Sequence, residues 1–176
     1  MSLKDDQLRI VREELVLFME RVIANHRAAG QVASGRTSAS MHVEVEGDEG
    51  TVFGRMAFGT LETGRRAGRV PSNFRSIIRQ WMADKGIKAA PIPYVRKPSE
   101  RWQPKYTPQE RGDMSLAGAI AHKIATSGTK LYRDGGRSDI YSNEIPKTTE
   151  AIMKRVVALF AVDVESINRE AVDESD

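Results

Sequence analysis

Histidine can act as an acid, a base or a metal ligand. The sequence contains three histidines, which are far apart along the chain: His26, His42 and His122. His42 is followed two residues later by Glu44 in a segment of alternating apolar and polar residues, so the two side chains share one face of a predicted strand. An imidazole beside a carboxylate can hold a metal ion or transfer a proton. No third ligand stands in the same segment, so we favour a surface pair over an enzyme that uses His42 and Glu44.

The other residues that commonly catalyse reactions occur without the neighbours that would activate them. Ser, Thr and Lys stand outside any G-x-S-x-G or S-x-x-K sequence. The Gly64–Gly68 turn and the Gly135-Gly136 pair fit neither a phosphate-binding loop nor a dinucleotide-binding fingerprint. The chain has no cysteine, which excludes disulfides, thiol catalysis and cysteine-ligated metals. We therefore predict that the protein is not an enzyme and has no catalytic residues, no metal site and no cofactor.

Charge points more clearly to a partner. The net charge is only +3, but 12 basic and 3 acidic residues between Arg65 and Arg111 give that segment +9 and leave −6 for the rest. The stretch 162–176 carries −5. This dipolar layout suits contact with a polyanion or head-to-tail contact between copies. The alternative is a solvated surface on which the charges are simply distributed unevenly. The basic residues expected to face a neighbouring subunit or DNA are Arg65, Arg66, Arg69, Arg96, Lys97, Arg101 and Lys105.

Hydrophobic periodicity predicts a long helix followed by a β-hairpin. A helix is expected from about Lys4 to Ala29, because apolar residues recur there at steps of three and four: Leu8, Val11, Leu15, Phe18 and Val22. Alternating residues then predict strands over 39–46 and 51–57, joined by a loop at 47–50. Because two strands alone are marginal in water, the hairpin must pack on a helix or on strands of another copy.

A glycine-punctuated basic turn and further helices are predicted after the hairpin. In the turn, which covers 58–71, Glu62 is expected to form a salt bridge with Arg65 or Arg66, and Pro71 suits the first turn of the next helix. That helix ends at Lys85-Gly86 and places an apolar side in the core: Phe74, Ile77, Ile78, Trp81 and Met82. A short helix is predicted over 115–127, and a second long helix after Ile145-Pro146 to about Ala171.

The segment 88–112 contains five of the seven prolines, which predicts an extended arm and not a helix or central strand. Three aromatic residues in it, interleaved with cations, are expected to dock on a partner: Tyr94, Trp102 and Tyr106. The alternative is a linker whose aromatic residues pack back locally. Together the elements predict a single α+β domain over 1–176, in which a small antiparallel hairpin packs against long N- and C-terminal helices and 88–112 is the proline-rich arm.

Three motifs occur in order in the centre of the chain. The first reads E-x-G-R-x-x-G-x-x-P, with Glu62, Gly64, Gly68 and Pro71 at its fixed positions. The second, W-x-x-x-K-G-I, contains Trp81, Lys85 and Gly86, and the third, A-x-x-I-A-x-K-I-x-x-x-G-T, spans 117–129. Together they resemble a tailed-bacteriophage neck or tail-completion family, whose small proteins join heads to tails. The resemblance covers most of residues 4–160, and the proline-rich insertion at 88–112 departs from it.

The resemblance implies a non-enzymatic structural virion protein of the head–tail connector. Such a protein forms an oligomeric ring between portal and tail, around the channel that DNA crosses. Its implied partners are further copies of itself, the portal or adaptor proteins, the tail proteins and the DNA in the channel. Its implied location is the neck or tail of the virion, after assembly in the host cytoplasm. The departure at 88–112 then becomes a contact arm.

The residues alone leave a second function open, which is non-specific nucleic-acid binding by the +9 segment. Such contacts would be independent of DNA sequence and sensitive to salt. No helix-turn-helix, zinc finger or RNP motif indicates a sequence-specific regulator. We expect no membrane contact, because no apolar run approaches the about 18 residues that span a bilayer. Residues 1–7 also lead into a polar amphipathic segment and not into the apolar stretch of a secretory signal.

Overall fold

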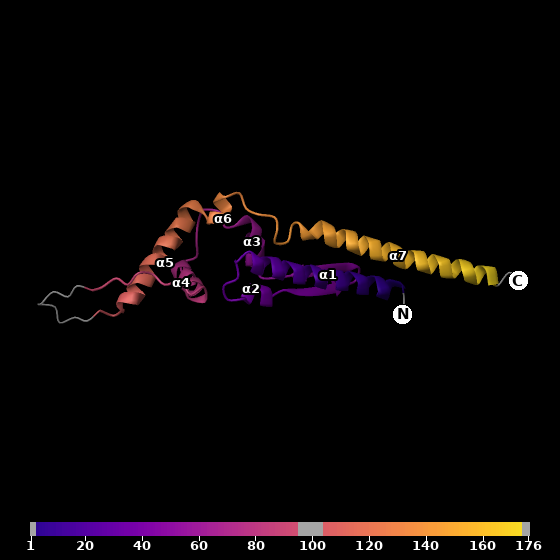
Figure 1. The fold of residues 1–176 in the computed structure, drawn as a ribbon, viewed down its shortest axis with the longest axis horizontal. Helices are drawn as coiled ribbons and strands as arrows, with labels where there is room; N and C mark the ends of the chain where they lie inside the picture. The colour runs from indigo at the N-terminus through magenta and orange to yellow at the C-terminus, as the bar shows by residue number, and fades with distance from the viewer. Residues whose placement is uncertain (1–2, 95–103, 174–176) are drawn as a thin grey trace, which may run out of the picture. The chain divides into compact units, whose positions relative to one another are not determined.

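The computed structural model describes residues 3–94 and 104–173, which form an α+β fold that is mostly helical (Figure 1). The helices are α1 (Leu3–Ala28), α2 (Arg36–Ala39), α3 (Thr60–Thr63), α4 (Phe74–Asp84), α5 (Pro108–Ser127), α6 (Lys130–Arg133) and α7 (Glu144–Asp173), with a 3₁₀-helix, η1, at Met56–Gly59. Strands β1 (His42–Glu46) and β2 (Glu49–Phe53) form an antiparallel hairpin. The predicted fold class, a small hairpin with long N- and C-terminal helices, is confirmed.

The chain divides into two compact units. Unit 1 comprises residues 1–32, 36–62 and 138–176, and unit 2 comprises residues 33–35 and 63–137. Apart from residues 33–35, the chain therefore leaves unit 1 after Glu62 and returns to it at Ser138. A domain is a part of a chain that can fold alone, and a division into compact units does not test that ability. The single domain therefore stays a prediction.

In unit 1, helix α1 packs against both the hairpin and α7. The hairpin comes so close that a Cβ atom on Gly50 would lie 2.6 Å from Leu15 and from Val11 of the predicted apolar stripe. Helix α7 runs antiparallel to α1, because Arg21 is bonded to Glu144 at the start of α7 while Glu14, earlier in α1, is bonded to Arg155 further along it. Figure 1 shows both neighbours beside α1.

The hairpin is shorter than predicted. Its strands are joined by the two residues Gly47 and Asp48, and Glu46 pairs directly with Glu49. The tight loop needs the positive φ of 61° that Gly47 adopts. Ala39, predicted to begin the first strand, lies instead in the short helix α2, and residues 56–59 form the 3₁₀-helix η1.

In unit 2, α4 packs on α5 around a small core of Ile78, Met82, Ala117 and Ala121. The prediction that Trp81 belongs to the core was wrong, since Trp81 is 37% exposed. The reason is that α4 is covered mainly by α5, so only the row Phe74, Ile78 and Met82, at steps of four, faces it. Ile77 and Trp81 lie on the adjoining, open side of α4.

Helix α5 begins at Pro108, seven residues earlier than predicted, so the arm ends sooner than residue 112. Thr107 accepts a hydrogen bond from the backbone of Glu110, and the Glu110 carboxylate accepts one from the backbone N–H of Thr107 at 2.8 Å. This reciprocal cap starts the helix, and Pro108 is tolerated because a first-turn residue needs no N–H partner. Residues 89–92 then run alongside the helix, where Ile92 donates to the Pro108 carbonyl at 2.9 Å.

The ends of the other helices follow local chemistry. Helix α4 ends as predicted at Lys85-Gly86, where Gly86 has a φ of 66° and Ile87 donates to the Met82 carbonyl at 2.8 Å. Pro71, predicted in the first turn of that helix, lies in the turn before it. Helix α7 starts at Glu144, slightly before Ile145-Pro146, and stays helical to Asp173. No helix within the described residues is long and apolar enough to cross a membrane.

Candidate functional site

The glycine turn after Glu62 is fastened to the start of α6. Arg65 donates its backbone N–H to the hydroxyl of Thr129 at 2.9 Å, and Thr129 donates its own N–H to the Arg65 carbonyl at 2.9 Å. Gly64 has a φ of 67°, and a Cβ atom there would lie 2.5 Å from the backbone nitrogen of Tyr132. Both the backbone conformation and the space therefore require glycine at this motif position.

The side chain of Arg65 stabilises this turn. Its guanidinium donates to the Arg69 carbonyl at 2.8 Å and lies 5.6 Å from the centre of the Phe74 ring. Its Nε is buried and has no hydrogen-bond partner among the described residues. Of the predicted contact residues, Arg65 is thus half-buried and occupied within its own unit.

Arg66 and Arg69, by contrast, are exposed on the same turn. Arg75 and Arg79 continue the exposed cations along α4, one helical turn apart. Within the described part of the chain, the side chains of these four arginines make no hydrogen bond and no ion pair. The charge of Arg79 nevertheless helps to lower the pKa of Glu110 and Asp113. Arg66, Arg69 and Arg75 are therefore the cations most available to a partner.

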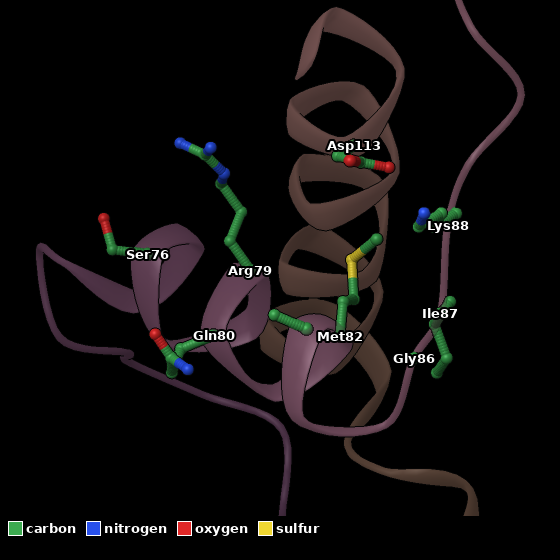
Figure 2. Close-up of a pocket in the computed structure, with 9 residues that line it drawn as sticks. Ser76, Arg79, Gln80, Met82, Gly86, Ile87, Lys88 and Asp113 are labelled. Atoms are coloured by element: carbon green, nitrogen blue, oxygen red, sulfur yellow. The ribbon is translucent and has the colours of Figure 1, made fainter. Parts of the chain in front are cut away.

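A cavity of about 510 Å³ at the end of α4 contains two of the unit 2 cations (Figure 2). In Figure 2, Asp113 of α5 lies between Arg79 and Lys88. Hydrogen bonds from the Ala89 backbone and Gln109, with both cations nearby, hold the pKa of Asp113 below its usual value. An ionised carboxylate therefore offsets part of the positive charge here, which makes this hollow less suited to an anion than the arginines of the turn.

The base of the arm joins aromatic and basic side chains. Arg111 lies 5.6 Å from the centre of the Tyr94 ring, and Lys105 lies 5.5 Å from that of Tyr106. These residues line a cavity of about 540 Å³ together with Met114 and others. Tyr94 is half-buried, whereas Tyr106 is 40% exposed. The other predicted arm residues lie outside the described part of the chain: Arg96, Lys97, Arg101 and Trp102.

The two units carry opposite charge. Unit 2 has 16 Lys and Arg against 5 Asp and Glu, a net charge of +11, while unit 1 has 11 against 19, a net charge of −8. The sequence predicted a basic segment, but its charge is larger than +9 once the cations after Arg111 are assigned to the same unit. The candidate site is therefore the cationic surface of unit 2, hereafter the basic surface, defined by Arg66, Arg69, Arg75 and Arg79.

Glu62, expected to pair with the arginines of the turn, binds a loop of unit 1 instead. Its Oε1 accepts backbone N–H groups from Ile140, Tyr141 and Ser142 at 2.8, 2.7 and 3.0 Å, and Oε2 accepts the Ser142 hydroxyl. Burial, the largest single influence, would raise the pKa of Glu62, but these hydrogen bonds together lower it below 4.5. The side chain is only 3% exposed, so it holds structure and offers no contact to a partner.

The other motif residues also shape the backbone. Gly68 has a φ of 140° and donates its N–H to the Ala125 carbonyl at 2.8 Å, which holds the turn on α5. Lys85 caps α4, and Gly86 supplies the left-handed residue after it. The end of α4 at Lys85 and Gly86 is local and was predicted, whereas the contact of Gly68 with Ala125 could not be predicted from spacing because it joins residues far apart in the chain.

His42 and Glu44 do lie on one face of β1, as predicted. His42 Nε2 is 3.2 Å from Glu44 Oε1, both side chains are more than half exposed, and the imidazole stacks on Phe53 at 5.4 Å. No group of three or more acidic or histidine side chains that could hold a metal is found among the described residues. The pair is thus a solvent-exposed contact on the surface of the hairpin.

The sequence pattern assigned Phe160 and Val164 to one apolar row with Ile152 and Val156, but it did not reveal a separate exposed stripe on the side of α7 that faces away from α1. Its four members are each at least 42% exposed: Met153, Val157, Phe160 and Val164. Their steps of four and three were masked by a second apolar row on the same helix, through Ile152 and Val156, which is half-buried.

Comparison of the chain with models of protein families, with curated proteins and with solved structures finds no match.

Proposed function

We propose that this protein is a structural subunit that assembles head to tail into a ring, as a component of the head–tail connector of a tailed bacteriophage. The observation that carries the proposal is the separation of charge, +11 in unit 2 and −8 in unit 1. In a cyclic assembly each copy presents both surfaces, so the basic surface of one copy meets the acidic unit of the next and rotation closes the ring.

The assignment to the phage neck depends on the three motifs. Several of their residues fix the backbone. Glu62 accepts hydrogen bonds from the loop at 140–142, Gly64 packs closely against the backbone at the start of α6, and Gly86 ends α4. In a structural subunit, the neighbouring subunits recognise the shape and charge of its surface. Motif residues that fix the backbone maintain that shape. The pattern therefore favours an assembly role over catalysis.

Electron microscopy of the purified protein, together with mass spectrometry of purified virions, tests this function. We expect rings of one copy number and the presence of the chain in virions. Absence from virions, combined with normal joining of heads and tails when the protein is not made, would overturn the proposal.

A second candidate function, non-specific binding of nucleic acid, is favoured by the exposed and unpaired arginines of the basic surface. In that case the logarithm of the DNA affinity falls linearly with the logarithm of salt concentration. The double variant Arg66→Ala/Arg69→Ala should reduce the slope by about two, roughly one per lost phosphate contact. If DNA binding is unaffected by the double variant, this function is wrong, and the arginines are left to the subunit contact.

A further inference from the structure

We propose that α7 pairs with α7 of a second copy, in antiparallel orientation, through the stripe of Met153, Val157, Phe160 and Val164. This pairing goes beyond the ring proposed above and does not depend on it, because it uses a different surface and different chemistry.

The stripe has the geometry of a helix–helix seam. Its members follow one another at steps of four, three and four, which places them on one line along the helix. They are 62, 66, 42 and 53% exposed, whereas the opposite side of α7 is turned to α1 through Thr148 and Arg155. Four large apolar side chains in one row on a helix that already has a partner on its other side indicate a second partner.

A hollow beside the stripe can receive a side chain. Pro146, Thr149, Glu150, Met153, Lys154 and Val157, all on α7, line one side of a shallow, open depression of about 610 Å³. When two copies of α7 pair antiparallel about a two-fold axis between residues 157 and 160, Phe160 of each copy comes opposite Val157 of the other. Phe160 then lies over the end of this hollow, which is knobs-into-holes packing.

Charge selects the second copy and the antiparallel orientation. Lys154 lies at one edge of the stripe, and Glu165, eleven residues later, lies along the same edge. Two helices that pair about a two-fold axis bring the same edge together in opposite order, so Lys154 of each copy faces Glu165 of the other. The same self-complementary contact therefore forms twice in the dimer.

The expected dimer is weak. Four side chains that are about half exposed offer on the order of 200 Å² of apolar surface per copy. This is well below the roughly 800 Å² per partner of a standard stable interface, so we expect weak dimerisation, with a dissociation constant in the micromolar range. Because the contact is mainly apolar, it persists at 1 M salt, where the Debye length is about 3 Å and the charge contacts of a ring are screened.

Sedimentation equilibrium of the full chain at 1 M salt tests the pairing with a matched pair of variants. Val157→Lys should weaken dimerisation by about tenfold or more, since it buries a charge in the seam of both copies. Val162→Lys is the control, because Val162 is 67% exposed on the same helix but lies about 140° around it from Val157. Circular dichroism should show both variants folded, as both positions are exposed.

Cysteine cross-linking tests the orientation, and the chain is suited to it because it has no native cysteine. Met153→Cys mixed with Val164→Cys should form a disulfide-linked dimer, while neither variant alone should link to itself. In the antiparallel pair the two copies of Met153 lie about 16 Å apart along the axis, too far for a disulfide.

The proposal is overturned if the protein is monomeric at 1 M salt across the micromolar range, or if Val157→Lys and Val162→Lys dimerise like the parent chain. It is also overturned if Met153→Cys links to itself while the mixture does not, which indicates a parallel pair. A monomeric Val157→Cys variant that resists alkylation would also overturn the proposal, because the chain would then cover its own stripe. Loss of the salt-sensitive ring with the high-salt dimer intact would instead contradict only the proposed function.

Discussion

Glu62 accepts a hydrogen bond from the backbone N–H of Tyr141 at 2.7 Å, although the two residues are 79 positions apart in the chain. Between them lie residues 63–137, which are all of unit 2 except residues 33–35. The contact therefore fixes, within unit 1, the two chain segments at which the insertion leaves and returns. The motif glutamate, which the spacing places beside the arginines of unit 2, instead anchors a loop of its own unit, unit 1.

Replacement of this anchor should destabilise the protein. Glu62→Gln removes the charge that three N–H groups and one hydroxyl share, and we expect a loss of about 2 kcal/mol in the free energy of unfolding. Chemical denaturation followed by circular dichroism measures it. Glu20→Gln, at an exposed position of α1, is the control and should change stability by no more than about 0.5 kcal/mol. Equal effects of the two substitutions would show that the anchor contributes nothing.

The same anchor predicts a pH dependence. The folded-state pKa of Glu62 is lower than the ordinary value of 4.5, so its contribution is present above about pH 4.5 and is lost as the pH falls through the folded pKa. Denaturation midpoints measured from neutral pH downward should therefore fall in acid, and less steeply in Glu62→Gln than in the parent chain. Identical slopes in the two proteins would contradict the assignment.

Gly64 should tolerate no side chain. A Cβ atom there would lie 2.5 Å from a backbone nitrogen, whereas at Gly30, with nearly the same φ (66° against 67°), it would meet nothing within 4 Å. Gly30→Ala should cost about 1 kcal/mol for the left-handed conformation alone. Gly64→Ala should cost at least about 2 kcal/mol more, because the turn must also move away from α6. Thermal unfolding compares the two variants, and similar melting temperatures would refute the close approach.

Neighbouring arginines should behave differently. Arg65→Ala removes the bond to the Arg69 carbonyl and the contact with Phe74, so we expect a loss of about 1–2 kcal/mol in stability. Arg66→Ala, at an exposed and unpaired position, should leave stability within about 0.5 kcal/mol and instead weaken assembly at low salt. If Arg66→Ala lowers the free energy of unfolding as much as Arg65→Ala does, the distinction between the structural role of Arg65 and the basic surface fails.

The elements of the fold could largely be predicted from local sequence. The periodic apolar residues of α1 and α7, the alternation in β1 and the glycine after α4 each follow a local rule. These helices formed close to their predicted bounds, and β1 formed three residues shorter than predicted. Local rules failed where a competing local signal was stronger: the cap at Thr107 and Glu110 begins α5 inside a segment that its prolines marked as extended.

The candidate site was less predictable, for a physical reason. Whether a side chain is buried depends on how many helices cover its own helix, and α4 is covered mainly by α5, which leaves Trp81 partly exposed. Whether an arginine is available depends on distant partners, such as Thr129 and the Phe74 ring for Arg65 and its turn. The arm residues Arg96, Lys97, Arg101 and Trp102 stay predictions.

Native mass spectrometry of the full chain at low and then rising ionic strength tests the central claim most directly. We predict a closed oligomer of one copy number, larger than a dimer, that dissociates as salt screens the contact between the +11 and −8 units. A protein that never exceeds a dimer at low salt, or whose larger oligomer is indifferent to salt, would contradict it.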